Sequence, residues 1–247
     1  MSLACCTEQQ LLDRLAQELE ARRGGWLVTA NLDFLRRHHI DARLRALYAE
    51  ADLRVADGMP LVWAAWLQGT PLPERIAGAS LMRPLAEVAS RVGRRLYLLG
   101  GDTGVAEKAA EVLRKELPAL EIAGWSSPML PAEPGPEAVL PLIDVLRDAR
   151  ADLVLVALGS PKQEWLIQKL RAALPTCWFV GVGMSFSFLV GHMARAPQWM
   201  QKSGLEWLHR LLSEPRRLGT RYLVHGAPFG LELLARSALR RLAGPRT

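Results

Sequence analysis

The chain has 247 residues, half of them hydrophobic, and a formal net charge of +6. This length allows one large α/β domain whose core needs no disulfide framework, and the three cysteines, at positions 5, 6 and 177, have neither disulfide nor metal-ligand spacing. Because no apolar run approaches the roughly 20 residues of a membrane-spanning helix, and no secretory signal is visible, we expect a soluble or peripheral protein of the reducing cytoplasm.

The first part of the chain alternates short β-rich segments with amphipathic helical segments. The predicted strands cover residues 26–30, 53–56, 95–100, 120–124, 153–158 and 177–183. The predicted helices cover residues 7–22, 34–49, 59–68, 79–92, 103–116, 136–149 and 161–173. This alternation predicts an α/β fold, with a Rossmann-like, mostly parallel sheet flanked by helices. Several strands lack polar alternation, as expected when helices cover both faces of a sheet.

From Arg195 onwards the β signal disappears, and the chain is typical of helices punctuated by Pro197, Pro215, Gly226 and Pro228. We therefore predict an α/β domain over residues 1–194 and a basic helical appendage over residues 195–247. The appendage has ten Lys or Arg residues against three Glu residues, so it carries more positive charge than the whole chain. Such a segment attracts the phosphates of nucleic acid, anionic lipid or a diphosphate substrate, and a solvated helical face is the alternative.

Polar residues follow most of the predicted strands, at the edge where open α/β sheets bind ligands. These turns contain "TAN" (29–31), "DG" (57–58), "GGDTG" (100–104), "GSPKQE" (159–164) and "GVGMSFS" (181–187). The "GGDTG" turn is neither a P-loop nor a dinucleotide fingerprint. Its glycines and free N–H groups are equally compatible with a phosphate ligand and with a helix capped by Asp102 or Thr103.

Two of these turns leave a structural and a functional interpretation open. Asp57 interrupts the apolar passage "RVADGMPLVWA" (54–64), either as a chemically active acid or as the N-cap of the following helix. Three polar residues of "GSPKQE" indicate a site at a strand end, unless Ser160 caps the helix and the acid is an ordinary first-turn residue. The three are Lys162, Gln163 and Glu164.

Seven stretches, in this order, together resemble the WecB/TagA/CpsF bacterial glycosyltransferases, glycosyltransferase family 26. They are "VTANLDFL", "VADGMPLVWA", "ERIAGASL", "LYLLGGDTGVAEKAA", "LGSPKQEW", "GVGMSFSFLVGHMARAPQW" and "GLEWLHRLLSEPRRLGTRY", and they cover about residues 25 to 225. The resemblance implies transfer of a sugar, with inversion, from a UDP-sugar to a polyprenyl-diphosphate-linked saccharide. The reaction would belong to cell-surface or exopolysaccharide biosynthesis, at the cytoplasmic face of the membrane, with no metal in the active site and no cofactor.

The resemblance also implies roles for individual residues. Asp57 corresponds to the general base, and an apolar surround that raises its pKa would help it accept a proton. Arg75 would steady charge on the departing UDP, and a surface ion pair with Glu74 or another acid is the alternative. Thr29 and Asn31 would orient the sugar or diphosphate. The nucleotide sugar would meet Lys162, Gln163 and Glu164 in a pocket shaped by Gly100, Gly101, Gly181 and Gly183.

In the appendage, the resemblance places four arginines at the diphosphate of donor or acceptor: Arg210, Arg216, Arg217 and Arg221. Trp199 and Trp207 would enter the interface of an anionic membrane surface, and ordinary helix packing is the alternative for Trp207. We expect no nucleic-acid partner, because the basic segment lacks interleaved aromatic stacking residues. A homo-oligomer is conceivable.

One departure from the family pattern concerns Ser187, which stands where many relatives have an acid within "FDF". This difference keeps open a non-catalytic module that binds a nucleotide sugar or a phospholipid. The donor sugar is also open among N-acetylmannosamine, its uronic acid and glucose, because hydroxyl discrimination depends on pocket geometry.

Overall fold

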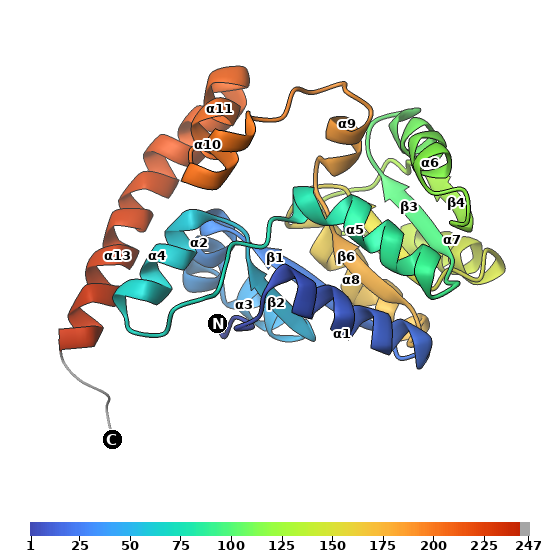
Figure 1. Cartoon of the computed structure of the whole chain (residues 1–247), viewed down its shortest axis with the longest axis horizontal. Coiled ribbons are helices and arrows are strands. Elements are labelled where there is room, and N and C mark those ends of the chain that lie inside the picture. The colour runs from blue at the N-terminus through green and yellow to red at the C-terminus, as the bar shows by residue number, and fades with distance from the viewer. Residues whose placement is uncertain (243–247) are drawn as a thin grey trace.

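The computed structural model describes residues 1–242, except the side chains of Lys202 and Arg217. Its centre is a six-stranded, all-parallel sheet with the strand order β2-β1-β6-β5-β3-β4 (Figure 1). The strands are β1 (Gly25–Ala30), β2 (Leu53–Ala56), β3 (Leu96–Gly100), β4 (Ile122–Ser126), β5 (Leu153–Ala157) and β6 (Trp178–Gly181). This arrangement confirms the predicted Rossmann-like α/β class.

Helices cover both faces of the sheet. One face is packed against α1 (Glu8–Glu20), α5 (Gly78–Arg91) and α6 (Val105–Glu116), and the other against α2 (Leu32–Ile40), α3 (Ala42–Ala49), α7 (Pro136–Asp148) and α8 (Lys162–Ala173). Along β5, Leu153 and Leu155 enter the first core while Val154 and Val156 enter the second. The strand is therefore apolar at every position, which explains the missing alternation in the sequence.

Two predicted elements differ from the structure. The helix predicted over residues 34–49 is divided at Asp41, whose extended backbone ends α2 and whose carboxylate accepts hydrogen bonds from the N–H groups of Arg43 and Leu44 at the start of α3. Asp is favoured at such a cap because its oxygen satisfies first-turn donors. The strand predicted over residues 120–124 lies two residues later, where Trp125 and Ser126 pair with β3.

Beyond β6 the chain is helical. Short α9 (Ser185–Leu189) is followed by α10 (Gln198–Ser203), α11 (Glu206–Ser213), α12 (Pro215–Gly219), the π-helical segment η1 (Thr220–Gly226) and α13 (Ala227–Leu242). Gly226 and Pro228 do not separate helices as predicted, because η1 joins α12 to α13 without a break. The wider π turn directly before Pro228 accommodates a ring that would otherwise meet the carbonyl of the preceding turn.

These C-terminal helices pack against the body of the molecule. Helix α13 lies along α4 (Met59–Leu67), and η1 contacts α2 (Figure 1). Leu218 is fully buried, and a Cβ added at Gly230 would be 3.2 Å from the Leu32 side chain. Within residues 1–242, no helix combines the length and the apolar character needed to cross a membrane. The division at residues 194 and 195 stays a prediction.

The sheet order brings the predicted polar turns together at one edge. The Asp57 N–H donates to the Ala30 carbonyl (2.8 Å), so the turns after β1 and β2 adjoin. The Gly101 N–H donates to the Ala157 carbonyl (2.7 Å), which joins the turns after β3 and β5. Because β6 pairs with both β1 and β5, the turn after β6 lies between these two groups.

Candidate active site

The Asp57 carboxylate lies at the end of β2 and accepts a hydrogen bond from the Gly78 N–H (3.2 Å). Gly78 is the first residue of α5, so the acid interacts with the N-terminus of that helix. The N-cap of α4 is Gly58, with φ +145° and no side-chain cap, so Asp57 does not cap the helix that follows it. A conformation at this φ favours glycine, which explains the "DG" pair.

Burial raises the pKa of Asp57 to about 6. The Arg75 guanidinium, the Gly78 N–H and Arg210 act in the opposite direction, while Glu206 adds to the rise. The carboxyl group is consequently ionised at neutral pH but more basic than an ordinary aspartate. The raised pKa expected for Asp57 is thus found, with burial as its main cause and charged groups as its neighbours.

Arg75 lies beside Asp57 and forms an ion pair with Glu206 of α11, from its Nη1 to the carboxylate Oε2 (3.0 Å). Its acidic partner is thus from the appendage and is not the adjacent Glu74. A cavity of about 380 Å³ adjoins Arg75. Its walls come from α4, from the segment before α5 and from α10, and consist of Met59, Val62, Pro73, Glu74, Arg75 and Gln201.

Arg210 of α11 faces the turn after β6, where its Nη2 lies 3.7 Å from the Met184 sulfur. Its Nε is buried and has no hydrogen-bond partner within the described part of the chain. Arg210 is also close enough to Asp57 to lower the pKa of that acid. A buried guanidinium N–H without a protein acceptor is suited to an anionic ligand, because leaving it unpaired is costly.

Thr29, Gly78, Gly181 and Gln163 pack closely between Asp57 and the centre of the sheet edge. The Thr29 hydroxyl donates to the Gly181 carbonyl (3.5 Å). A Cβ at Gly78 would be 2.7 Å from the Thr29 Oγ1, and one at Gly181 would overlap the Gln163 side-chain amide. The two glycines therefore allow the four residues to meet.

Gln163 and Glu164 are both buried, and the Gln163 side-chain amide donates to the Glu164 carboxylate (2.9 Å). Burial raises the pKa of Glu164, opposed by its hydrogen bonds and by Arg37. The Gln163 Oε1 has no partner within residues 1–242, so it remains free to accept a hydrogen bond from a ligand. Ser160 does not cap α8, whose N-cap is Pro161, so that part of the structural alternative is wrong, whereas Glu164 does lie in the first turn of the helix.

Other predicted residues have contacts away from Asp57. The Asn31 Oδ1 accepts from the Phe34 N–H (3.0 Å) and so caps α2. The Lys162 Nζ donates to the Leu130 carbonyl (2.9 Å) in the proline-rich loop. Arg216 is exposed on α12, and the side chain of Arg217 lies outside the described residues. The predicted substrate contacts of these residues stay predictions.

Arg221, in η1, belongs to an ion-pair cluster around the buried Asp33 of α2. The Asp33 carboxylate lies 2.7 Å from Arg37, 2.9 Å from Arg221 and 3.4 Å from Arg36. Arg221 thus connects the appendage to the start of α2, and its Nε has no hydrogen-bond partner in the described chain. Its proximity to a diphosphate stays a prediction.

Backbone angles and close contacts explain the glycines of these turns. Gly100 has φ +106°, and a Cβ there would be 2.6 Å from the Ala157 carbonyl oxygen. Gly101 and Gly183 also have positive φ, at +77° and +56°. The N-cap of α6 is Gly104, with no side-chain cap, so neither Asp102 nor Thr103 has the predicted capping role.

The sequence alone does not reveal the partners of three residues in this region, which are Gly78, Asp33 and Glu206. Gly78 lies inside "ERIAG" and Asp33 inside "TANLD", yet neither pattern indicates which partner each will meet. Glu206 lies in the first turn of α11, where an acid is common, and its carboxylate forms an ion pair with Arg75. Ser187 is buried in α9, where its carbonyl accepts from the Met193 N–H (3.2 Å).

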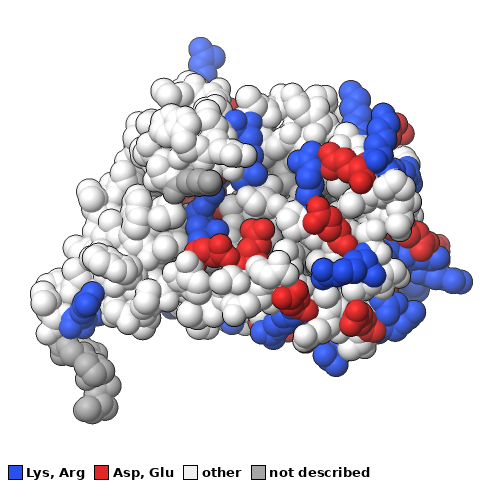
Figure 2. Space-filling view, in the orientation of Figure 1, with Lys and Arg blue, Asp and Glu red and all other residues white. Residues whose placement is uncertain are grey.

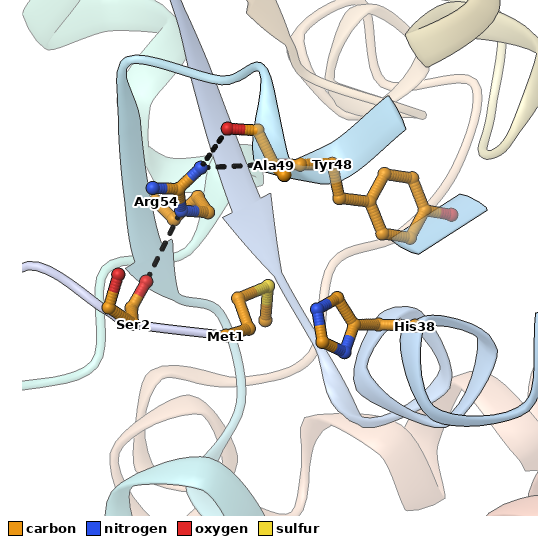
Figure 3. A pocket seen from close by; sticks show the side chains of 6 residues that line it. All are labelled: Met1, Ser2, His38, Tyr48, Ala49 and Arg54. Atoms are coloured by element: carbon orange, nitrogen blue, oxygen red, sulfur yellow. Dashed lines mark hydrogen bonds between the residues drawn. The ribbon is translucent and has the colours of Figure 1, made fainter. Parts of the chain in front are cut away.

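A separate cavity between the N-terminus, α2, α3 and β2 contains none of the predicted site residues. It is lined by Met1, Ser2, His38, Tyr48, Ala49 and Arg54 (Figure 3). Arg54 closes one side by donating to the carbonyls of Ser2, Tyr48 and Ala49 (Figure 3). These bonds satisfy the guanidinium with backbone oxygens, as in a structural role.

Comparison with known proteins shows the family of the chain. The sequence model of the "Glycosyl transferase WecG/TagA/CpsF family" matches residues 1–243. A similar protein is the N-acetylglucosaminyldiphosphoundecaprenol N-acetyl-beta-D-mannosaminyltransferase of Bacillus spizizenii (strain ATCC 23059 / NRRL B-14472 / W23). The two are 33% identical over 199 residues, which is 81% of this chain and 75% of that protein. With its parallel sheet and its acid at the carboxyl edge, the chain belongs to the WecG/TagA/CpsF family of glycosyltransferases.

Proposed function

We propose that the protein transfers N-acetylmannosamine from a UDP-sugar to a polyprenyl-diphosphate-linked N-acetylglucosamine, with inversion. The sugar and the acceptor are those in the name of the Bacillus relative. The observation that carries the proposal is the Asp57 carboxylate, which has a pKa raised to about 6 and lies beside Arg75 and Arg210. One general base next to two cations is what glycosyl transfer from a nucleoside diphosphate requires.

Asp57 would act on the acceptor hydroxyl. As the acceptor oxygen attacks the anomeric carbon, its proton passes to the Asp57 carboxylate. The bond between that carbon and the β-phosphate oxygen breaks, and UDP leaves with the electron pair. Attack on the face opposite the leaving group inverts the anomeric centre. A carboxylate with a pKa near 6 is a better proton acceptor than an ordinary aspartate and is still ionised at neutral pH.

Arg75 and Arg210 would bind the diphosphate whose charge grows as the bond breaks. Arginine suits this task because its N–H donors can bind two phosphate oxygens at once. The unpaired Nε of Arg210 supports the assignment. Gln163 and Thr29, packed together nearby, would contact the sugar or the nucleotide.

The appendage would hold the enzyme on the cytoplasmic face of the membrane that contains the acceptor. Figure 2 shows that the visible face of α10, α11 and α13 has few charged side chains, whereas the surface over α1, α5 and α6 has many of both signs. Large apolar side chains are exposed on these C-terminal helices: Trp199, Trp207, Leu212, Leu223, Val224, Leu231, Leu239 and Leu242. Apolar residues among arginines favour an anionic lipid interface.

UDP release tests the proposed reaction. The purified protein is given a polyprenyl-diphospho-N-acetylglucosamine and, in separate reactions, UDP-N-acetylmannosamine, UDP-glucose or the uronic acid donor. We expect acceptor-dependent UDP release and a product heavier by one N-acetylhexosamine. Asp57→Asn should lower the rate by about 10²- to 10⁴-fold, the usual contribution of a general base.

The same assay identifies the alternative function. Binding of the UDP-sugar without turnover by the parent protein would indicate a non-catalytic module. An Asp57→Asn protein that releases UDP at the parental rate would show that Asp57 is not the base. Release only with UDP-glucose would leave the reaction class intact and change the donor.

A further inference from the structure

Glu206 joins the appendage to the proposed catalytic centre through two arginines. Its Oε2 accepts from the Arg75 Nη1 (3.0 Å), and its Oε1 lies 3.4 Å from the Arg195 Nε. The side chains of Glu206, Arg75 and Arg195 are 13%, 15% and 24% exposed. A carboxylate this buried needs both partners, because an unpaired charge would be expensive to hold there.

The body of the molecule fixes the backbone next to Arg75 but gives its side chain little support. The N–H of Ile76 donates to the carbonyl of Ala56 (2.9 Å), which places the adjacent Arg75 backbone beside the end of β2. The hydrogen bond found for the Arg75 guanidinium within the described chain goes to Glu206. Since a free arginine side chain samples many rotamers, the direction of this one depends on an acid from α11.

Arg195 anchors Glu206 from the other side. The Arg195 Nη2 donates to the hydroxyl of Ser80 in α5 (2.8 Å). Helix α5 is also the helix whose first N–H binds Asp57. These contacts connect α5, through Arg195 and Glu206, to Arg75. Both α5 and Arg75 also act on the Asp57 carboxylate.

The charge of Glu206 also acts on Asp57. Arg75 and Arg210 lower the pKa of Asp57, whereas Glu206 raises it. Without the Glu206 charge, the two arginines would act on Asp57 without this opposing effect. The acid would become a weaker base.

We propose that Glu206 is a positioning residue for the transfer reaction, whose carboxylate holds the Arg75 guanidinium at the Asp57 site. This inference rests on the proposed function. It assigns to α11 a share in the chemistry that is distinct from membrane binding.

The test compares Glu206→Gln with the parent protein over pH 4.5 to 8.5 in the UDP-release assay. Gln has nearly the shape of Glu but no charge. We expect kcat/KM to fall by about 10- to 100-fold, as for lost positioning of a group that stabilises charge. The acid limb of the kcat/KM profile, near pH 6 in the parent, separates the two effects of Glu206 on Asp57: a limb at lower pH follows from loss of the Glu206 charge, and a limb at higher pH follows from displacement of Arg75.

Glu232→Gln is the matched control, because Glu232 is an ion-paired acid on α13 whose partner is Arg236 of the same helix. It should leave both the rate and the acid limb unchanged. Glu206→Asp keeps the charge on a shorter side chain, so it should retain the parental acid limb and recover part of the rate. It also serves as the second variant if Glu206→Gln folds poorly.

A parental rate in Glu206→Gln would overturn the proposal. A Glu206→Asp protein no more active than Glu206→Gln would overturn it as well, because a retained carboxylate should still hold part of the Arg75 population at the site. A parent protein without acceptor-dependent UDP release would instead refute the proposed function, which separates the two failures.

Discussion

At the scale of single residues, Asp57 combines two requirements that oppose each other. A general base at neutral pH should be ionised, yet it is a better base when its charged form is disfavoured. Burial disfavours the charge, while Arg75 and the N-terminus of α5 stabilise it. The result is a carboxylate with a pKa near 6.

Because the pKa of Asp57 is raised in the folded protein, we expect its ionised carboxylate to destabilise the fold at pH values above this pKa. In the folded protein its pKa is about 6 against 3.8 for the ordinary group, so the folded state binds more protons between these values. The free energy of unfolding therefore falls as pH rises through this window, by about 2–3 kcal/mol. Asp57→Asn, whose amide oxygen can still accept from Gly78, should be more stable by about this amount at pH 8.

Urea unfolding at two pH values checks this expectation. The gain of Asp57→Asn should be present at pH 8 and should nearly disappear at pH 3.5, where the aspartate is mostly protonated in both states. An equal gain at both pH values would mean that packing, and not ionisation, causes the difference. The variant would then combine higher stability with lost turnover for separate reasons.

At the scale of secondary-structure elements, the ion pair between Asp33 and Arg221 fixes η1 to the start of α2. The Asp33 side chain is 8% exposed and is the shared partner of Arg36, Arg37 and Arg221. Removing a buried acid leaves its partners uncompensated, so the loss exceeds the strength of the pair itself. This contact connects the C-terminal helices to α2, and the pair between Glu206 and Arg75 connects them to the segment before α5.

Asp33→Asn should therefore loosen the C-terminal helices. We expect a loss of about 2–4 kcal/mol in unfolding free energy and faster tryptic cleavage within η1 and α13. Asp144→Asn is the matched control, since Asp144 forms an exposed pair with Arg147 on α7. It should change stability by less than about 0.5 kcal/mol. Equal cleavage of the two variants would contradict the role given to Asp33.

At the scale of the whole molecule, the visible face of the body has many charged side chains of both signs, whereas that of the C-terminal helices has few (Figure 2). The proposed acceptor is a lipid, so the surface that faces the bilayer must present apolar groups and must also leave the sheet edge accessible. The C-terminal helices meet both conditions, because they expose leucines while α11 brings Arg210 and Glu206 to Asp57.

Vesicle binding tests this orientation. Replacing Leu231 and Leu239 of α13 by Ser removes two side chains that are 72% and 64% exposed. We expect binding to phosphatidylglycerol vesicles to weaken by about tenfold or more, with little change in stability. The matched control replaces Leu140 and Val145 of α7, which are 59% and 45% exposed on the body. Equal weakening by both pairs would show that α13 is not the membrane-binding surface.

The sequence could predict the strands because several of them, such as β5, are apolar at every position, and it could predict the helices because they have clear amphipathic periodicity. It could also predict the polar residues after the strands, since a parallel sheet collects those turns at one edge. The positions at which helices end or continue were harder to predict. Asp41 divides a helix through a cap that its neighbours do not reveal, and the π turn keeps Gly226 and Pro228 within one helix.

By itself, the sequence determined the fold class, the family motifs and the identity of Asp57 as the acid at a strand end. Only the tertiary structure decided which groups act on that acid. Gly78, Arg75, Arg210 and Glu206 are separated from Asp57 by up to about 150 residues along the chain. A pKa depends on burial and on charges brought close in space, and neither quantity is a property of a local stretch of sequence. The same reason explains why Asp57 binds the N-terminus of α5 and not that of the helix directly after it.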